Sequence, residues 1–167
     1  MDLTVRCEEG RDWSSIYTVN EAAFGRADEA NLVADLRRDG VVLASLVAEI
    51  NEQLVGHILF SRMSIETANG VIPAAALAPL AIVPEYQRQG VGGRLIRDGL
   101  DLLRKRGESI VIVLGHPDYY PRFGFSPERA RLLESPFPPE AFMAMELTAG
   151  ALDGIKGKVK YPAAFEI

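Results

Sequence analysis

The chain has 167 residues, 48% of them hydrophobic and 25% charged, a composition typical of a single globular domain covering residues 1–167. Its formal net charge of −5 argues against broad binding to nucleic acid or to anionic membranes. We find no apolar run of about 18 residues and no signal peptide, and Cys7 is the single cysteine, so we expect a cytoplasmic protein without a membrane span.

The first part of the chain predicts one strand and two helices. Residues 3–7 are strand-like, and apolar side chains then recur at helical spacing over residues 12–24. This spacing places Trp13 and Tyr17 in the predicted core. A second amphipathic helix is predicted over residues 31–38, with Gly40 as its natural stop.

The middle of the chain predicts strands. Residues 41–50 and 54–65 flank a polar turn and are typical of a β-hairpin, in which His57 alternates with apolar neighbours as a sheet residue does. Residues 76–83 are apolar nearly throughout, which is typical of a strand buried on both faces. Pro84 ends this strand.

A strongly patterned helix is predicted over residues 91–106 and a buried strand over residues 109–114. A strand, a helix and a strand in this order predict a parallel pair with a right-handed crossover. Elsewhere we expect an antiparallel sheet. Beyond it we expect a short turn or helix at residues 117–122, a proline-rich connector at 135–139 and a final strand pair around residues 141–147 and 158–161.

The connection between the predicted strand at residues 76–83 and the helix predicted over residues 91–106 is rich in glycine and reads Gln87-Arg88-Gln89-Gly90-Val91-Gly92-Gly93. Glycines let a ligand approach the backbone, and the first amides of a helix have no intrahelical acceptor and lie at the positive end of its dipole. The loop therefore predicts a phosphate cradle, with Arg88 and Arg94 as flanking cations. It is not a Walker loop, because the chain has no G-x-x-x-x-G-K followed by Ser or Thr, and it is not a dinucleotide fingerprint, because Leu95 stands where the third glycine belongs.

The spacing of Gln87, Gly90 and Gly92 resembles the Q-x-x-G-x-G loop of the GNAT-type N-acetyltransferases. Residues 77–84, Leu-Ala-Pro-Leu-Ala-Ile-Val-Pro, look like the strand that precedes this loop in the family. Residues 117–125, Pro-Asp-Tyr-Tyr-Pro-Arg-Phe-Gly-Phe, are similar to its later segment ending in Gly-Phe. The resemblance extends over essentially the whole chain and is closest to a YhbS-like bacterial subgroup.

The resemblance implies a mixed α/β (α+β) fold, a GNAT-like acyl-CoA acyltransferase fold with a single mostly antiparallel central sheet, a splayed parallel strand pair and flanking helices. It implies acetyl-CoA as the donor and no metal. The diphosphate would lie on the amides of residues 88–93 and the pantetheine arm along residues 80–83, with the thioester between Ile82 and Leu114. The implied cofactor-binding residues are Leu80, Ala81, Ile82, Val83, Gln87, Arg88, Gln89, Gly90, Val91, Gly92, Gly93, Arg94 and Leu114.

Direct acetyl transfer needs a neutral amine, stabilisation of an oxyanion and a proton for the departing thiolate. The family's proton donor is a tyrosine four residues before the glycine of Gly-Phe, which is Tyr120 here, whereas Tyr119 would point elsewhere. A phenol stays protonated at neutral pH and can donate to sulfur. The base that deprotonates the amine is either water or a side chain. Among the side chains His116 is the first candidate, and His57, Glu85 and Glu66 are the others.

The predicted function is direct transfer of the acetyl group of acetyl-CoA to a primary amine. No motif selects the acceptor among small molecules, peptide N-termini and protein lysines. One alternative is a non-catalytic acyl-CoA sensor or partner-binding domain, against which Tyr120 argues. Another is a transferase that uses a longer acyl chain or a hydroxyl acceptor. A homodimer is the default expectation for a small enzyme.

Overall fold

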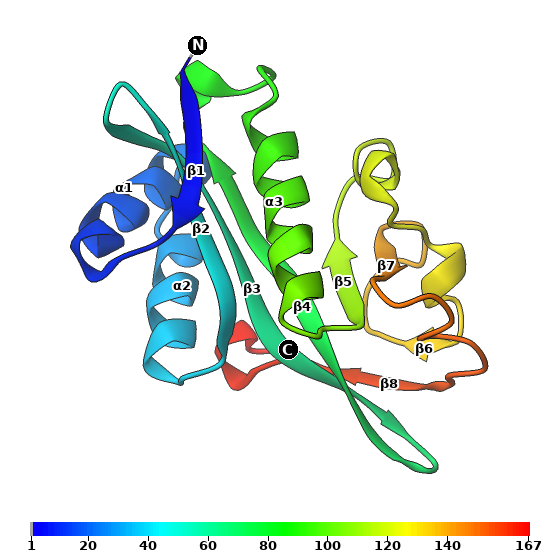
Figure 1. Cartoon of the computed structure of the whole chain (residues 1–167). Helices are drawn as coiled ribbons and strands as arrows, with labels where there is room; N and C mark the ends of the chain where they lie inside the picture. The colour runs from blue at the N-terminus through cyan, green and yellow to red at the C-terminus, as the bar shows by residue number, and fades with distance from the viewer. Residues whose placement is uncertain (1) are drawn as a thin grey trace.

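The computed structural model describes residues 2–167, which form one mixed sheet with helices on both faces (Figure 1). The strands are β1 (Leu3–Cys7), β2 (Val42–Ile50), β3 (Gln53–Thr67), β4 (Gly70–Ile82), β5 (Ile110–Leu114), β6 (Leu133–Glu134), β7 (Phe142–Glu146) and β8 (Gly157–Lys160). The α-helices are α1 (Trp13–Phe24), α2 (Asp28–Arg38) and α3 (Val91–Lys105). The short 3-10 helices are η1 (Gly10–Asp12), η2 (Pro84–Tyr86), η3 (Tyr120–Phe123), η4 (Glu128–Ala130) and η5 (Ala163–Phe165).

The strands follow the order β1-β2-β3-β4-β5-β7 across the sheet. Neighbours along this order are antiparallel except β4 and β5, which are parallel and joined through α3. The strand β3 is long enough to share one of its edges between two partners: β2 pairs with residues 53–61 and β8 with residues 64–67. The hairpin, the parallel pair and the mostly antiparallel sheet predicted from the sequence are therefore confirmed.

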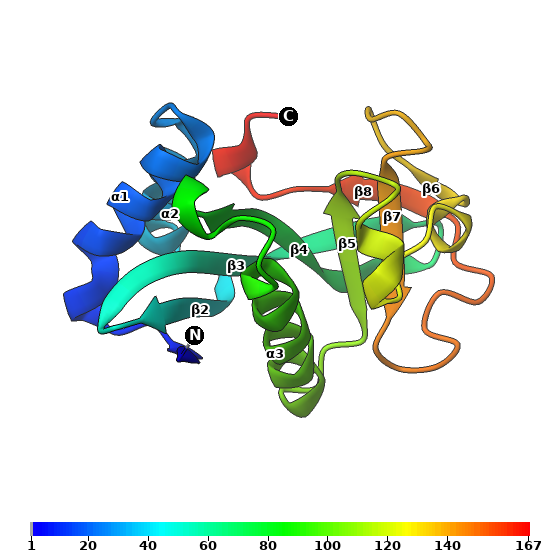
Figure 2. The same ribbon diagram turned by 90° about the horizontal axis from the view of Figure 1, so that it is seen from above.

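The helix α3 lies on one face of the sheet and α1 and α2 lie on the other (Figure 2). The helix begins after Gly90 and ends before Gly107, both in the left-handed region with φ of 86° and 85°. No helix within residues 2–167 is long and apolar enough to cross a membrane. The fold thus presents the N-terminal end of α3 just beyond the end of β4.

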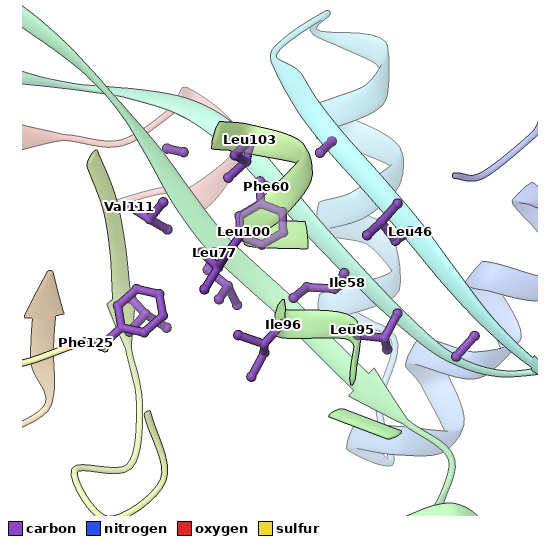
Figure 3. Packing of buried hydrophobic residues seen from close by; sticks show 14 of the residues in the cluster. Leu46, Ile58, Phe60, Leu77, Leu95, Ile96, Leu100, Leu103, Val111 and Phe125 are labelled. Atoms are coloured by element: carbon purple, nitrogen blue, oxygen red, sulfur yellow. The ribbon is translucent and has the colours of Figure 1, made fainter. Parts of the chain in front are cut away.

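The main core lies between α3 and the sheet, with Phe60 near its centre (Figure 3). Here the helix approaches the sheet closely, because a β-carbon added to Gly99 would lie 2.4 Å from the Phe60 ring. Only glycine fits this contact without movement. The apolar stripe predicted for this helix forms this interface, and the buried residues of α3 are Val91, Gly93, Leu95, Ile96, Gly99, Leu100 and Leu103.

Trp13 and Tyr17 do not belong to the core, which corrects the prediction from helical spacing. Trp13 is 50% exposed; its indole N–H donates to Glu8 at 2.8 Å and the Arg37 guanidinium lies over its ring. Tyr17 is half-buried and its hydroxyl donates to Asn31 at 2.8 Å. Both aromatic residues lie at the margin of α1, where their polar atoms reach partners, while the sheet covers a narrower stripe of the helix.

Two further predictions about strands were wrong in detail. The strand β4 begins at Gly70 rather than Ala76, because the turn before it is tight and lets the extended end of β3 pair along its whole length. The last long strands do not pair with each other. Instead β7 pairs with β5, and β8 pairs with β3 and β6, so the two lie in separate parts of the sheet.

Candidate active site

The parallel strands β4 and β5 diverge soon after they meet (Figure 1). They pair only through Ala75 with Val111 and Ala76 with Ile112, although β4 continues to Ile82 and β5 to Leu114. Beyond this point each strand is hydrogen-bonded to its other neighbour only, β4 to β3 and β5 to β7. The facing edges of the two strands therefore carry backbone groups that have no strand partner.

The loop after β4 presents a row of unpaired amides. Pro84–Tyr86 forms a single 3-10 turn, and Arg88 and Gly90 then adopt left-handed backbone conformations with φ of 64° and 86°. Within residues 2–167, no backbone or side-chain acceptor takes the N–H groups of residues 88–93. The N–H of Arg94 is the first to bond, to the carbonyl of Gly90 at 3.1 Å. These amides lie at the positive end of α3 and form an anion-binding surface.

Polar side chains of the same loop are mostly engaged with the protein itself. Gln87 Nε2 donates to the carbonyl of Ile82 at 2.9 Å, and Gln89 Nε2 donates to the carbonyl of Glu85 at 3.0 Å. Arg94 pairs with Asp98 one turn along α3, at 2.9 Å. The structure brings these sequence-predicted residues together, but Gln87 and Gln89 shape the loop, and its amides carry the free donors.

The end of β4 presents different side chains to its two faces. Leu80, Ile82 and Val83 pack against the core beneath α3, whereas Ala81 is fully buried and pairs with His57 of β3. Leu114, at the end of β5, is 44% exposed. The diverging ends of the two strands are thus lined by partly exposed apolar side chains.

Tyr119 and Tyr120 point in different directions, as the sequence predicted. The Tyr120 ring lies against Gly115, the first residue after β5, and meets Phe125 edge-on with 5.8 Å between ring centroids. Burial, with a smaller contribution from Tyr119, raises the pKa of the Tyr120 phenol to about 12. Tyr119 instead extends towards the first turn of α3, where its hydroxyl lies 2.8 Å from the position of a β-carbon on Gly92.

His116 lies between the end of β5 and the two tyrosines. Its side chain is exposed, and its carbonyl accepts the N–H groups of Tyr119 and Tyr120 at 3.1 and 3.3 Å. No group of three His, Cys, Asp or Glu side chains in residues 2–167 has the arrangement of a metal site.

Comparison with known protein families identifies the family to which this chain belongs. A family model described as an acetyltransferase (GNAT) domain matches residues 4–127, which include β4, the loop, α3 and the tyrosine pair. The chain belongs to the GNAT acetyltransferase family.

Two relatives from Escherichia coli K12 support the assignment to the GNAT family. The N-acetyltransferase YjhQ is 46% identical over 127 residues, which cover 75% of this chain and 70% of YjhQ. The N-acetyltransferase YhbS is 34% identical over 166 residues, which cover 98% of both chains. Both relatives carry the name uncharacterized N-acetyltransferase. The present chain is therefore a GNAT N-acetyltransferase, as its sequence predicted.

Solved GNAT structures share its fold. The crystal structure of E. coli YhbS in complex with CoA matches with a TM-score of 0.91 and 33% identity, covering 99% of this chain and 92% of that one. A GNAT acetyltransferase from Brucella melitensis in complex with acetyl-CoA matches with a TM-score of 0.82 and 33% identity, covering 98% of each chain. The mixed sheet with its splayed parallel pair is the fold of these enzymes.

His57 of this GNAT enzyme is fully buried in a polar network away from solvent. Asn20 Nδ2 donates to His57 Nδ1 at 3.2 Å, so Nε2 carries the proton and donates to Ser45 Oγ at 2.8 Å. The Ser45 hydroxyl in turn donates to Glu8. Burial lowers the pKa of His57 to about 4, and the imidazole is neutral. His57 is the sheet residue predicted from the sequence.

Sequence reasoning missed three residues around the first turn of α3: Arg97, Arg122 and Phe123. Phe123 packs within 3.4 Å of the position of a β-carbon on Gly93, and Arg97 lies over the Phe123 ring. The sequence feature that could have indicated these three residues is the small size of Gly92 and Gly93. It leaves room beside α3 for the segment that contains Tyr119. That signal does not say which later segment fills the room.

Proposed function

We propose that this GNAT enzyme binds acetyl-CoA through its diphosphate on the amides of residues 88–93 and transfers the acetyl group directly to a primary amine. The observation that carries the proposal is the row of consecutive unpaired N–H groups at the N-terminal end of α3. Hydrogen bonds to charged phosphate oxygens contribute about 1.5–3 kcal/mol each. A few of them supply the roughly 8 kcal/mol of a micromolar complex.

The proposal also draws on the relatives, since YhbS and the Brucella enzyme were crystallised with CoA and acetyl-CoA. In this chain the pantetheine arm would run along residues 80–83 and pair with the open edge of β4. The thioester would then lie where β4 and β5 diverge, between Ile82 and Leu114. The first turn of α3 and the splayed strands lie at the same end of the molecule, which suits one extended ligand (Figure 1).

The chemical step needs no metal. The neutral amine attacks the thioester carbonyl carbon, and a backbone amide near Ile82 stabilises the resulting oxyanion. When the intermediate collapses, the C–S bond breaks with its electron pair on sulfur, and Tyr120 donates its phenolic proton to that sulfur. The nitrogen loses its proton to water or to the exposed imidazole of His116. Solvent then returns a proton to Tyr120.

Tyr120 suits this role for two reasons. Its ring is held against Gly115 at the end of β5, beside the proposed position of the thioester. Its raised pKa keeps the phenol protonated across the physiological range. The acceptor in this proposal is a small-molecule or peptide amine, and a homodimer is its expected assembly.

The test of the donor site is calorimetry with acetyl-CoA on the wild type and on Gly90→Val. Valine disfavours the left-handed conformation of Gly90 by about 1–2 kcal/mol and turns the neighbouring amides away, so we expect binding to be lost. Gly107→Val is the matched control, because Gly107 has nearly the same φ and equally open surroundings at the other end of α3. Retained binding by Gly90→Val would remove the loop from the proposal.

The test of catalysis is release of free thiol from acetyl-CoA with a panel of primary amines, amino acids and peptides. We expect thiol release that depends on the amine and produces the N-acetylated compound, identified by mass spectrometry. Binding of acetyl-CoA without thiol release across the panel would instead support a non-catalytic acyl-CoA sensor. Release with alcohols only would contradict the amine acceptor.

A further inference from the structure

Three arginines among residues 2–167 have no hydrogen-bond or ion-pair partner, and two of them lie beside the same pair of aromatic rings. Nearly every arginine in residues 2–167 has a side-chain hydrogen bond or ion pair with another residue. Within those residues the exceptions are Arg88, Arg97 and Arg122. Arg88 lies in the loop after β4, Arg97 in α3 and Arg122 in η3. For a protein with a net charge of −5, this is a local excess of uncompensated positive charge.

Arg97 and Arg122 have defined positions although they are exposed. The guanidinium carbon of Arg122 lies 5.7 Å from the centroid of the Tyr119 ring, and that of Arg97 lies 5.1 Å from the centroid of the Phe123 ring. The two rings meet edge-on with 5.2 Å between their centroids. Tyr119 and Phe123 thus form an aromatic wall that carries two cations, and stacking on aromatic faces holds a guanidinium in place.

The aromatic wall lies directly beside the first turn of α3. The Tyr119 hydroxyl contacts Gly92 and the Phe123 ring contacts Gly93. Arg97 folds back along the helix, so that its Nη1 lies 3.2 Å from the position of a β-carbon on Gly93. The positive end of the helix dipole does not stabilise the charge of Arg97 or Arg122. The arrangement therefore concentrates positive potential that an anion would neutralise.

Burial raises the pKa of the Tyr119 phenol, while the charges of Arg122 and Arg97 both act to lower it. Both guanidiniums are therefore close enough to act on the same phenol. Positively charged or polarised groups therefore lie both in the loop amides and on the aromatic wall beside them.

We propose that Arg97 and Arg122 bind the 3′-phosphate of the acyl-CoA donor. This inference rests on the proposed function, in which residues 88–93 hold the diphosphate and the pantetheine arm enters between β4 and β5. The adenosine half of the donor then leaves the diphosphate in the opposite direction, over the outer surface of α3 and η3. Arg97 lies one helical turn, about 6 Å, beyond Gly93.

The chemistry of the 3′-phosphate matches these two residues. A phosphomonoester carries a charge of about −1.5 to −2 at pH 7, and planar guanidinium groups bind phosphate oxygens in pairs. The diphosphate is shared with many nucleotides, whereas the 3′-phosphate distinguishes coenzyme A from ADP derivatives. Arg97 and Arg122 are thus specificity-determining residues for the donor, and they act away from the reacting atoms.

The experiment compares the dissociation constants of CoA and 3′-dephospho-CoA by calorimetry, for the wild type and for Arg97→Gln, Arg122→Gln and the double variant. We expect the wild type to prefer CoA by roughly tenfold to a hundredfold. The double variant should bind CoA only as well as the wild type binds 3′-dephospho-CoA. Arg104→Gln is the matched control, because Arg104 is an exposed arginine of α3 that pairs with Asp101, and it should keep the full preference.

Each result separates the inference from alternatives. A wild type that binds both ligands equally would overturn it and leave the proposed function intact. Variants that weaken both ligands by the same factor would also overturn it, because that pattern would mean that the arginines only stiffen the aromatic wall. A wild type that binds neither ligand would overturn the proposed function together with the inference. Arg97→Lys, which keeps the charge, should retain part of the preference.

Discussion

The ring of Tyr120 lies so close to Gly115 that a β-carbon on Gly115 would be 2.3 Å from Cε2 of Tyr120. This contact joins the end of β5 to the proposed proton donor. The ring is also held edge-on by Tyr119 and Phe125, so it has little room to move aside. The position of the phenol therefore depends on the absence of a side chain at Gly115.

Gly115→Ala should displace the Tyr120 ring and lower kcat by about tenfold or more, because small misplacements of a catalytic group reduce turnover strongly. Affinity for acetyl-CoA, measured by calorimetry, should change little, since the loop of residues 88–93 is untouched. Gly10→Ala is a suitable control, because Gly10 has open space around it. Unchanged turnover in Gly115→Ala would show that the contact with Tyr120 has no catalytic importance.

Tyr120→Phe should lower kcat by about 10²-fold, the lower range for removal of a general acid, with little change in the dissociation constant of acetyl-CoA. Tyr119→Phe is the matched control, since Tyr119 is adjacent but directed at Gly92. Because burial raises the pKa of Tyr120 to about 12, deprotonation of the phenol should not reduce wild-type kcat up to about pH 10. Turnover of Tyr120→Phe equal to that of the wild type would exclude the proton-donor role.

Gly99→Ala should destabilise the protein by up to about 2 kcal/mol. Alanine improves helix propensity by about 1 kcal/mol, but overpacking of a core costs about 1–3 kcal/mol. The added methyl group would meet the fully buried Phe60 ring at 2.4 Å, and this ring cannot move away freely. Urea denaturation measures the change. The double variant Gly99→Ala with Phe60→Leu should show less than the sum of the two single losses.

The free energy of unfolding should fall as the pH is lowered from about 6.5 to about 4. Burial lowers the pKa of folded His57 to about 4, so in this window the unfolded chain takes up a proton that the folded protein does not. The loss is at most about 1.4 kcal/mol per pH unit and about 3 kcal/mol over the window. His57 contributes no further pH dependence below or above it.

Denaturation of the wild type and of His57→Gln at pH 7 and pH 5 tests the assignment to His57. The variant is expected to be less stable at pH 7, because it disturbs the hydrogen bonds with Asn20 and Ser45. Its stability should depend less on pH than that of the wild type. Equal slopes for both proteins would place the pH dependence on other groups, such as Glu8, whose pKa the contacts with Arg37 and Ser45 lower despite its burial.

Much of the fold could be predicted from the sequence, because its signals are local. The apolar stripe of α3, the glycines at both of its ends and the apolar run of β4 depend on periods of a few residues and on backbone freedom. The family could be predicted for the same reason, since the spacing of Gln87, Gly90 and Gly92 is a continuous pattern. The predicted position of Trp13 failed because helical spacing does not say how wide a stripe the sheet covers.

The sequence by itself determined that a glycine-rich loop joins a buried strand to an amphipathic helix, since backbone chemistry there depends on adjacent residues alone. Only the tertiary structure decided that Tyr119 faces Gly92 while Tyr120 faces Gly115, and that Arg97 and Arg122 lie over aromatic rings. These relationships join residues of α3, β5 and η3 that are distant in the chain. They follow from how the elements pack, which no local pattern of residue types encodes.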